Sequence, residues 1–210
     1  MLPTFDEVRA AVLALDHKWF GHTPEKPWDI NVVSLRDPNT ASDGIDQFTC
    51  AQTICCFNDE GEPVFGLYRA TTVPGLKAAQ REQKRREGIA IRVPGQERGS
   101  HVIRKHKGSY DAVCHDYNYP TIPVYRDPNR DGVIDLGGTI YTGDKGGRGL
   151  NIHKAGRHST IVGNWSEGCN VLAIESEFNE FMNIARAGVR VWGPSITTTL
   201  IDWPRSVWDS

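Results

Sequence analysis

The 210-residue sequence has no apolar run that approaches the ~18 residues a transmembrane helix requires. Its charges nearly balance, with 24 Lys and Arg against 26 Asp and Glu, so no strongly basic character favours a nucleic-acid partner. The N-terminal residues, Met1 to Glu7, lack the basic and apolar regions of a conventional secretory signal peptide. We therefore expect no signal peptide and no transmembrane segment, and a chain of this length predicts one main domain.

Cysteine is scarce and shows no metal-binding spacing. The chain has Cys50, Cys55, Cys56, Cys114 and Cys169. An odd number of thiols cannot all pair, and no C-x-x-C motif occurs among them. Free thiols in a reducing compartment are the simplest interpretation.

The N-terminal segment has the pattern of a short helix. Thr4 can cap it, and Glu7 occupies the reciprocal position of a capping box. Apolar residues then recur at helical spacing from Phe5 to Leu15. Prolines before Trp28 interrupt this pattern, so the segment reads as a helical extension that precedes the main domain.

From Ile30 onward the pattern changes to short strands separated by turn residues. We expect strands at 30–35, 47–57, 64–70, 89–93, 101–103, 112–114, 124–125 and 140–141. Near the C-terminus, Ser176 is placed to cap a helix and Gly188 to stop it, because four apolar residues between them share one face. Many short strands with a helix at each end predict a β-rich mixed α+β fold.

The stretch with the most chemical content begins at Asn151 and contains His153, which precedes Cys169 by sixteen residues. The thiolate is the reactive form of cysteine, and a nearby imidazole is its usual activator. Gly168, directly before the cysteine, permits a sharp turn and leaves backbone amides free to point at a developing oxyanion. The pair therefore predicts a thiol nucleophile and its base, and the alternative is an ordinary core or surface role for both.

The pattern Asn151-Ile152-His153 followed by Ser166-Glu167-Gly168-Cys169 resembles the signature of the L,D-transpeptidase (YkuD-like) catalytic domain. That family has a histidine, a gap of similar length and then Ser/Thr-His-Gly-Cys. The segments 68–72 and 125–135 are also similar to sequences of that family. The segments 93–96 and 105–108, together with 151–153, suggest a phage- or prophage-encoded branch of it.

The resemblance covers about residues 30 to 191 and implies a β-sandwich or barrel with flanking helices. It implies a helical extension over 1–28, a catalytic domain over 29–191 and a C-terminal tail over 192–210 that packs on the domain. It also implies cysteine acyl transfer on peptidoglycan stem peptides through a thioester, with no cofactor required. By position, Cys169 is then the nucleophile and His153 its base.

Other residues of the motif take their roles from the same resemblance. The amides of Gly168 and Cys169 would form part of an oxyanion hole, and Ser166 would orient the turn or the imidazole. Glu167 replaces the usual histidine, so no role is carried over to it. The further candidates for substrate contact are Trp165, His158, Asn151 and Asn170.

Water as the acyl acceptor gives a peptidase, and an amine gives a transpeptidase. We favour the peptidase, because transfer needs a second groove that excludes water and the sequence identifies none. Without a signal peptide, the protein is expected to be made in the cytoplasm and to act on the bacterial cell wall as a phage-type lysin, after holin- or virion-mediated delivery. A non-catalytic binding or structural module of a virion is an alternative.

Two metal sites also have to be considered. Asp127, Asn129 and Asp131 match the first half of a calcium-binding loop, but position twelve of that loop is Gly138, and a polar turn explains the same residues. For zinc, the candidates are His101, His106, His115 and His158, with Asp111 or Asp116. None shows the helical spacing of a zinc site, although a zinc-dependent peptidase or amidase that uses His153, another histidine and Cys169 remains a competing class.

Overall fold

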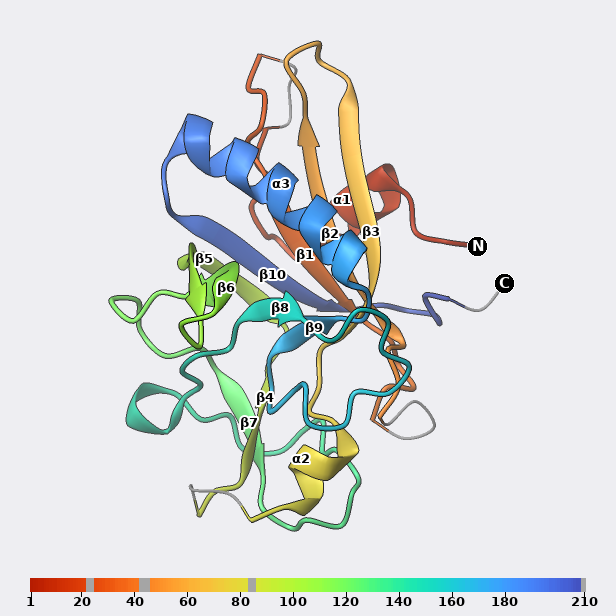
Figure 1. Cartoon of the computed structure of the whole chain (residues 1–210), viewed down its shortest axis with the longest axis vertical. Helices are drawn as coiled ribbons and strands as arrows, with labels where there is room; N and C mark the ends of the chain where they lie inside the picture. The colour runs from red at the N-terminus through yellow and green to blue at the C-terminus, as the bar shows by residue number, and fades with distance from the viewer. Residues whose placement is uncertain (22–24, 42–45, 83–85, 209–210) are drawn as a thin grey trace.

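The computed structural model describes residues 1–21, 25–41, 46–82 and 86–208, and a closed β-barrel forms its centre (Figure 1). The elements are α1 (Phe5–Ala14), β1 (Asn31–Arg36), β2 (Cys50–Phe57), β3 (Pro63–Thr71), α2 (Leu76–Gln80), β4 (Ile89–Arg92), β5 (Gly95–His106), β6 (Tyr110–His115), β7 (Val124–Asp127), β8 (Ile152–Lys154), β9 (Asn170–Leu172), α3 (Glu175–Trp192) and β10 (Ile196–Asp202). The order around the barrel is β1-β10-β5-β6-β8-β9-β3-β2, and β4 pairs with β7 in a separate two-stranded sheet. The predicted β-rich mixed α+β fold is confirmed.

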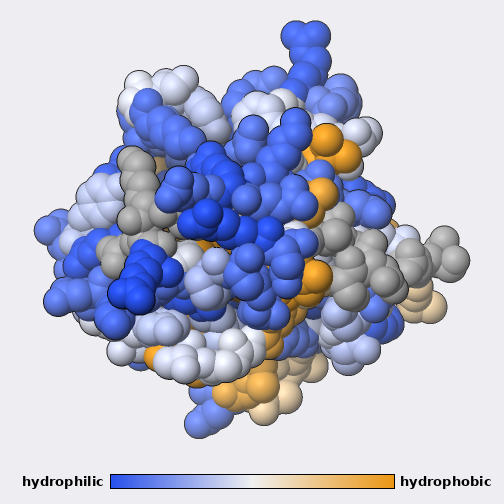
Figure 2. Space-filling view, turned by 90° about the horizontal axis from the view of Figure 1, so that it is seen from below, coloured by the Kyte–Doolittle hydropathy of each residue, from blue (hydrophilic) through white to orange (hydrophobic). Residues whose placement is uncertain are grey.

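Helix α3 lies across the barrel and inserts its apolar face into the main core (Figure 1). Phe178, Phe181 and Met182 pack there with Ile54 of β2 and Leu172 of β9. The face expected from the sequence is therefore the buried one, and each large side chain on it contributes about 1.5–3 kcal/mol by leaving water. The opposite end of the molecule, around α2 and the β4–β7 sheet, presents mainly hydrophilic side chains with small apolar patches (Figure 2). No helix in the described part of the chain combines the length and apolar character needed to span a membrane.

The predicted ends of α3 were wrong. Its N-cap is Ile174, with no side-chain cap, and the helix continues past Gly188 to Trp192 before Gly193 adopts a left-handed φ of 92°. Gly188 is needed for packing, because a Cβ there would lie 2.8 Å from the Ile30 Cγ2 atom. Position 188 therefore marks a close approach between the helix and the chain before β1, rather than a stop.

The N-terminal capping box is confirmed, and α1 packs on the barrel through a core cluster of its own. The Thr4 hydroxyl accepts a hydrogen bond from the Glu7 amide at 3.2 Å, and the Glu7 carboxylate accepts one from the Thr4 amide at 3.0 Å. Val8 and Val12 are buried against strands β1, β2 and β10 in a second core cluster. Leu15 lies beyond the end of the helix and is 53% exposed. Residues 22–24 of the expected extension lie outside the described residues.

The structure corrects the expectation of a C-terminal tail over 192–210. Its centre is β10, which lies between β1 and β5 and closes the barrel. β10 runs parallel to β1, with pairs from Val32↔Thr198 to Arg36↔Asp202, and antiparallel to β5. The strand was missed because its partners are distant in sequence, although its three consecutive threonines are β-branched residues that favour a strand.

Other strand limits in the structure also differ from those expected from the sequence. β5 covers 95–106 and not only 101–103, because polar residues extend it, and β9 was not expected. At 140–141 the structure has an isolated bridge between Tyr141 and Val124 instead of a strand. Leu76–Gln80 forms α2, which buries Ala78 and Ala79 under the β4–β7 sheet.

A chain that ends at Gly193 tests the place of β10. It keeps α3 but leaves the edges of β1 and β5 unpaired, so we expect no cooperative thermal unfolding by circular dichroism. A chain that ends at Trp208 is the control and should unfold like the full-length protein. Cooperative unfolding of the shorter chain at the same temperature would contradict a structural role for β10.

Candidate active site

The parallel pairing of β8 with β9 brings the predicted histidine and cysteine to one face. The register pairs Ile152 with Asn170 and His153 with Val171. Because side chains alternate along a strand, Cys169, directly before β9, projects to the same side as His153. The structure thus juxtaposes the two residues as the sequence predicted.

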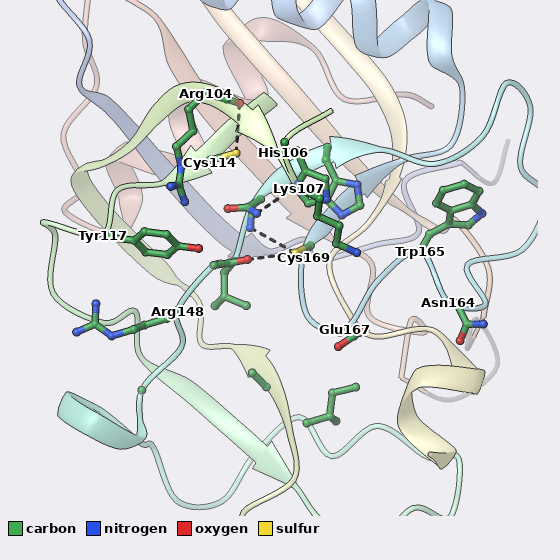
Figure 3. Close-up of a pocket in the computed structure, with 18 of the residues that line it drawn as sticks. Arg104, His106, Lys107, Cys114, Tyr117, Arg148, Asn164, Trp165, Glu167 and Cys169 are labelled. Atoms are coloured by element: carbon green, nitrogen blue, oxygen red, sulfur yellow. Dashed lines mark hydrogen bonds between the residues drawn. The ribbon is translucent and has the colours of Figure 1, made fainter. Parts of the chain in front are cut away.

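Both residues line a cleft of about 860 Å³ (Figure 3). Its walls come from the β5–β6 hairpin, from β4, from the segment 146–151 and from the turn 164–169. Trp165 lies on one side of the cysteine, and Arg104, Tyr117 and Arg148 lie on the other (Figure 3). The cleft therefore has an aromatic arm and a cationic arm with Cys169 between them.

The Cys169 thiol is half-buried and bonded to backbone. Its Sγ accepts a hydrogen bond from the Asn151 amide and donates one to the Gly149 carbonyl, both at 3.4 Å. Burial raises the pKa of this thiol to about 11, with a smaller opposing effect from the Asn151 amide. Cys169 is therefore a neutral thiol at rest, and no hydrogen bond joins it to His153 within the described residues.

His153 is neutral in a defined tautomer. The side chain is 4% exposed, and burial lowers its pKa to about 3, with His106 as the next largest cause. Its Nδ1–H donates to the Lys154 carbonyl at 2.9 Å, which leaves Nε2 unprotonated. A neutral imidazole with a free Nε2 is the form that accepts a proton from a thiol.

His106 is a part of the site that the sequence interpretation missed. Its ring stacks on His153 with centroids 4.2 Å apart and an interplanar angle of 22°. Its Nδ1 accepts a hydrogen bond from the Asn151 side chain at 3.2 Å, and burial together with Lys107 lowers its pKa. His106 was expected only as a possible zinc ligand, and its position next to the β5–β6 turn was the available signal.

Asn151 joins three parts of the site rather than standing free for substrate. Its amide donates to the Cys169 sulfur, its Nδ2 to His106, and its Oδ1 accepts from the His115 amide at 3.0 Å. These bonds fix the thiol and the second imidazole relative to β6. The side chain still lines the cleft.

The turn before the cysteine is held by Ser166. Its buried hydroxyl donates to the Cys169 carbonyl at 2.7 Å and accepts from the Gly168 amide at 3.2 Å, so it orients the turn and not the imidazole. Gly168 has a φ of 120°, and a Cβ there would lie 2.4 Å from the Ala90 carbonyl oxygen. Its amide is engaged and is not free for an oxyanion, which corrects that expectation. The Cys169 amide has no partner among the described residues.

Of the remaining candidates for substrate contact, one lines the cleft and two do not. Trp165 is 47% exposed and lines the cleft. His158 forms a backbone bridge with Ile174 and is not part of the cleft wall. Asn170 points to the opposite face of β9, where its Nδ2 donates to the Ser34 hydroxyl at 2.6 Å inside the barrel. Predicting contact for His158 and Asn170 was therefore wrong, because strand alternation and the path of the loop direct them elsewhere.

The zinc candidates form two pairs of neighbouring rings, His101 with His115 at 5.9 Å and His106 with His153 at 4.2 Å, and the first pair is bonded to protein groups. His101 is buried and bonded to Ser100 and the Leu150 carbonyl, and the His115 ring bonds the Pro120 carbonyl. Asp111 pairs with Lys105 and Arg186, and Asp116 accepts bonds from Asn118. In the described ranges, no three His, Cys, Asp or Glu side chains gather as metal ligands would.

The residues of the expected calcium loop form the hydrogen bonds of a polar turn. Asp127 is buried, and one of its oxygens accepts from the Asn129 amide at 3.2 Å. Asp131 accepts from the Val133 amide at 2.8 Å. Such bonds are typical of polar turns, so the geometry favours the turn alternative for this segment.

Positive charge dominates the cleft. Arg104 lies 4.0 Å from the centre of the Tyr117 ring, and Arg148 and Lys107 line the same space. Glu167 forms an ion pair with Arg81 at the rim. Such a lining favours a ligand with negative charge.

The fold and the site define a closed β-barrel protein with a cysteine and two stacked histidines in a cationic cleft. No protein-family model, curated protein or solved structure matches the chain.

Acid should destabilise the protein through its buried histidines. His101 and His153 have pKa values of about 3 when folded, below the usual value near 6.5. The unfolded chain therefore binds more protons between these values, so stability is complete above about pH 6.5 and falls as the pH drops. At about pH 5 the loss should be about 2 kcal/mol for each histidine, measured by urea unfolding. Equal stability at neutral pH and at pH 5 would contradict their burial.

His106 should control the protonation of His153. In the His106→Ala protein, water reaches the His153 ring, so its pKa should rise towards the ordinary value. The His106→Phe protein keeps a stacked ring and should hold that pKa low. The measurement is a titration of the His153 Cε1 proton by nuclear magnetic resonance, and identical midpoints in the parent and both variants would contradict the role of the stack.

Proposed function

We propose that this protein is a cysteine acyl-transfer enzyme that cleaves peptidoglycan stem peptides, with Cys169 as the nucleophile. The observation that carries the proposal is the shared face of β8 and β9. There the Cys169 thiol and a neutral His153 with a free Nε2 open into one cleft. The motif resemblance to L,D-transpeptidase (YkuD-like) domains supplies the substrate class.

The protonation states indicate how the first step proceeds. A thiol with a pKa of about 11 and an imidazole with a pKa of about 3 do not form a resting thiolate–imidazolium pair. Proton transfer therefore accompanies attack: Sγ bonds to the carbonyl carbon while Nε2 of His153 takes the thiol proton. This requires the thiol to leave the Gly149 carbonyl and turn towards Nε2 of His153 when substrate binds.

The reaction then completes as acyl transfer. The tetrahedral adduct collapses, the C–N bond breaks, and His153 gives its proton to the leaving amine. Water attacks the thioester next, His153 takes and returns one proton, and the products are a carboxylic acid and the free thiol. His106 and the Lys154 carbonyl hold the His153 ring in place through both steps.

The cleft supports a peptide substrate with carboxylates. Stem peptides carry several, and Arg104 and Arg148 present cationic groups on one arm of the cleft (Figure 3). On the other arm, the exposed face of Trp165 offers an apolar platform.

Hydrolysis is the first outcome we propose, because the thioester lies in a cleft that admits water, and crosslinking by transpeptidation is the second. A phage-type lysin, delivered to the wall by a holin or within a virion, fits the hydrolytic outcome. A non-catalytic binding module is the alternative. The observation that favours it is that Cys169 bonds backbone groups rather than His153 at rest.

Mass spectrometry of muropeptides tests the proposal. Purified peptidoglycan is incubated with the parent, with Cys169→Ala and with His153→Gln, and only the parent should release new stem-peptide fragments. Cys50→Ser is the matched control, because that buried thiol lies outside the cleft lining and bonds the Thr40 hydroxyl at 3.4 Å, which a serine hydroxyl can also do. New crosslinks would instead indicate a transpeptidase. No change across several wall chemotypes would reject catalysis in favour of binding.

A further inference from the structure

The site lacks a donor that acyl transfer requires. A developing oxyanion is usually stabilised by two or more positioned hydrogen-bond donors. The Gly168 amide is bonded to Ser166, so the turn contributes only the Cys169 amide. A second positive or hydrogen-bonding group has to come from another element of the cleft.

The tip of the β5–β6 hairpin provides such a group, Lys107, on a strained backbone. A bond from the Ser109 amide to the His106 carbonyl at 2.9 Å closes a two-residue turn formed by Lys107 and Gly108. Both have positive φ, 47° and 73°, the geometry that favours Asn-Gly. Lysine is an unfavourable residue in the left-handed region, and such strain is often found at functional sites.

The Lys107 side chain belongs to the reacting centre. It follows His106, which stacks on His153, and it lines the cleft beside Cys169 (Figure 3). Its charge opposes the burial that raises the pKa of Cys169, and it adds to the burial that lowers the pKa of His106 and His153. No ion pair or hydrogen bond engages it within the described residues.

We propose that Lys107 is a catalytic residue whose ammonium stabilises the negative charge that develops beside Cys169. The charge appears on sulfur as its proton moves to His153, and then on the carbonyl oxygen as the S–C bond forms. Lysine keeps its proton throughout and replaces the donor that Gly168 does not provide. The inference rests on the proposed function and names a residue that the motif does not contain.

Arg104 and Arg148 lie on the cationic arm of the cleft, and the remaining groups that act on the thiol oppose Lys107. Glu167, on the cysteine's own turn, raises its pKa but is paired with Arg81. Cys114 on β6 also raises it, and the two cleft histidines are neutral. Lys107 is therefore the cation that acts most directly on Cys169.

Three variants separate charge from fold. Lys107→Asn removes the charge but suits the left-handed turn, Lys107→Arg keeps the charge, and Lys105→Asn removes a neighbouring lysine that pairs with Asp111 at 3.0 Å. The readouts are the melting temperature, the pH profile of Cys169 alkylation by iodoacetamide, and kcat and KM for muropeptide cleavage.

In Lys107→Asn we expect an unchanged or higher melting temperature and alkylation of Cys169 that is about threefold to tenfold slower near pH 8. We expect kcat to fall about 100-fold with KM changed less than about threefold, as for the loss of one oxyanion donor. Lys107→Arg should retain most of both rates, and Lys105→Asn should match the parent.

The alkylation readout separates the two proposals. If the parent shows no turnover, the proposed function fails, while slower alkylation in Lys107→Asn alone still supports the role of Lys107 at the thiol. If the parent turns over and Lys107→Asn keeps its kcat and alkylation rate, Lys107 is rejected and the proposed function stands. If Lys105→Asn lost as much alkylation rate and kcat as Lys107→Asn, any nearby lysine charge would have this effect, and the inference would be overturned.

Discussion

The parallel pairing of β8 with β9 is the constraint on which the candidate site depends. Two consecutive three-residue strands, joined by the segment 155–169, fix Cys169 beside Asn151 through the bond from the Asn170 amide to the Asn151 carbonyl at 2.9 Å. The Asn170 side chain secures the register from inside the barrel, through Ser34 on β1. A shift by one residue would turn the thiol into the core and expose the asparagine, so the barrel interior and the cleft specify the same register.

Burial then sets the chemistry of the pair. Because the thiol and His153 are both desolvated, each is held in its neutral form, and neither gains the charge partner that would offset the loss of water. The hydrogen bonds at the site fix orientation instead: Nδ1 of His153 to the Lys154 carbonyl, and the sulfur to the backbone at 149 and 151. In the proposed reaction the proton therefore moves during attack rather than before it, and Lys107 is the cation whose charge acts on the sulfur.

Local patterns predicted the elements that depend on neighbours in sequence. The Thr4 capping box and the apolar face around Phe181 follow from helix geometry alone, and both are present. Where a residue's role depended on a distant partner, the same rules failed. Gly188 has the position of a stop signal, but its actual role is the contact with Ile30, which no local pattern reveals. β10 was missed for the same reason, since its stability comes from β1 and β5.

By itself, the sequence determined the β-rich class, the first helix with its cap, and the Cys169–His153 pair, because spacing and turn chemistry are local properties. Only the tertiary structure decided that Ser166 engages the Gly168 amide, that Asn170 and His158 face away from the cleft, and that His106 stacks on His153. These outcomes depend on strand alternation and on the closure of the barrel, which bring together residues as distant as 34 and 170. Long-range pairing has no signature within any window of the chain, so the partners of the Cys169 thiol were set by folding.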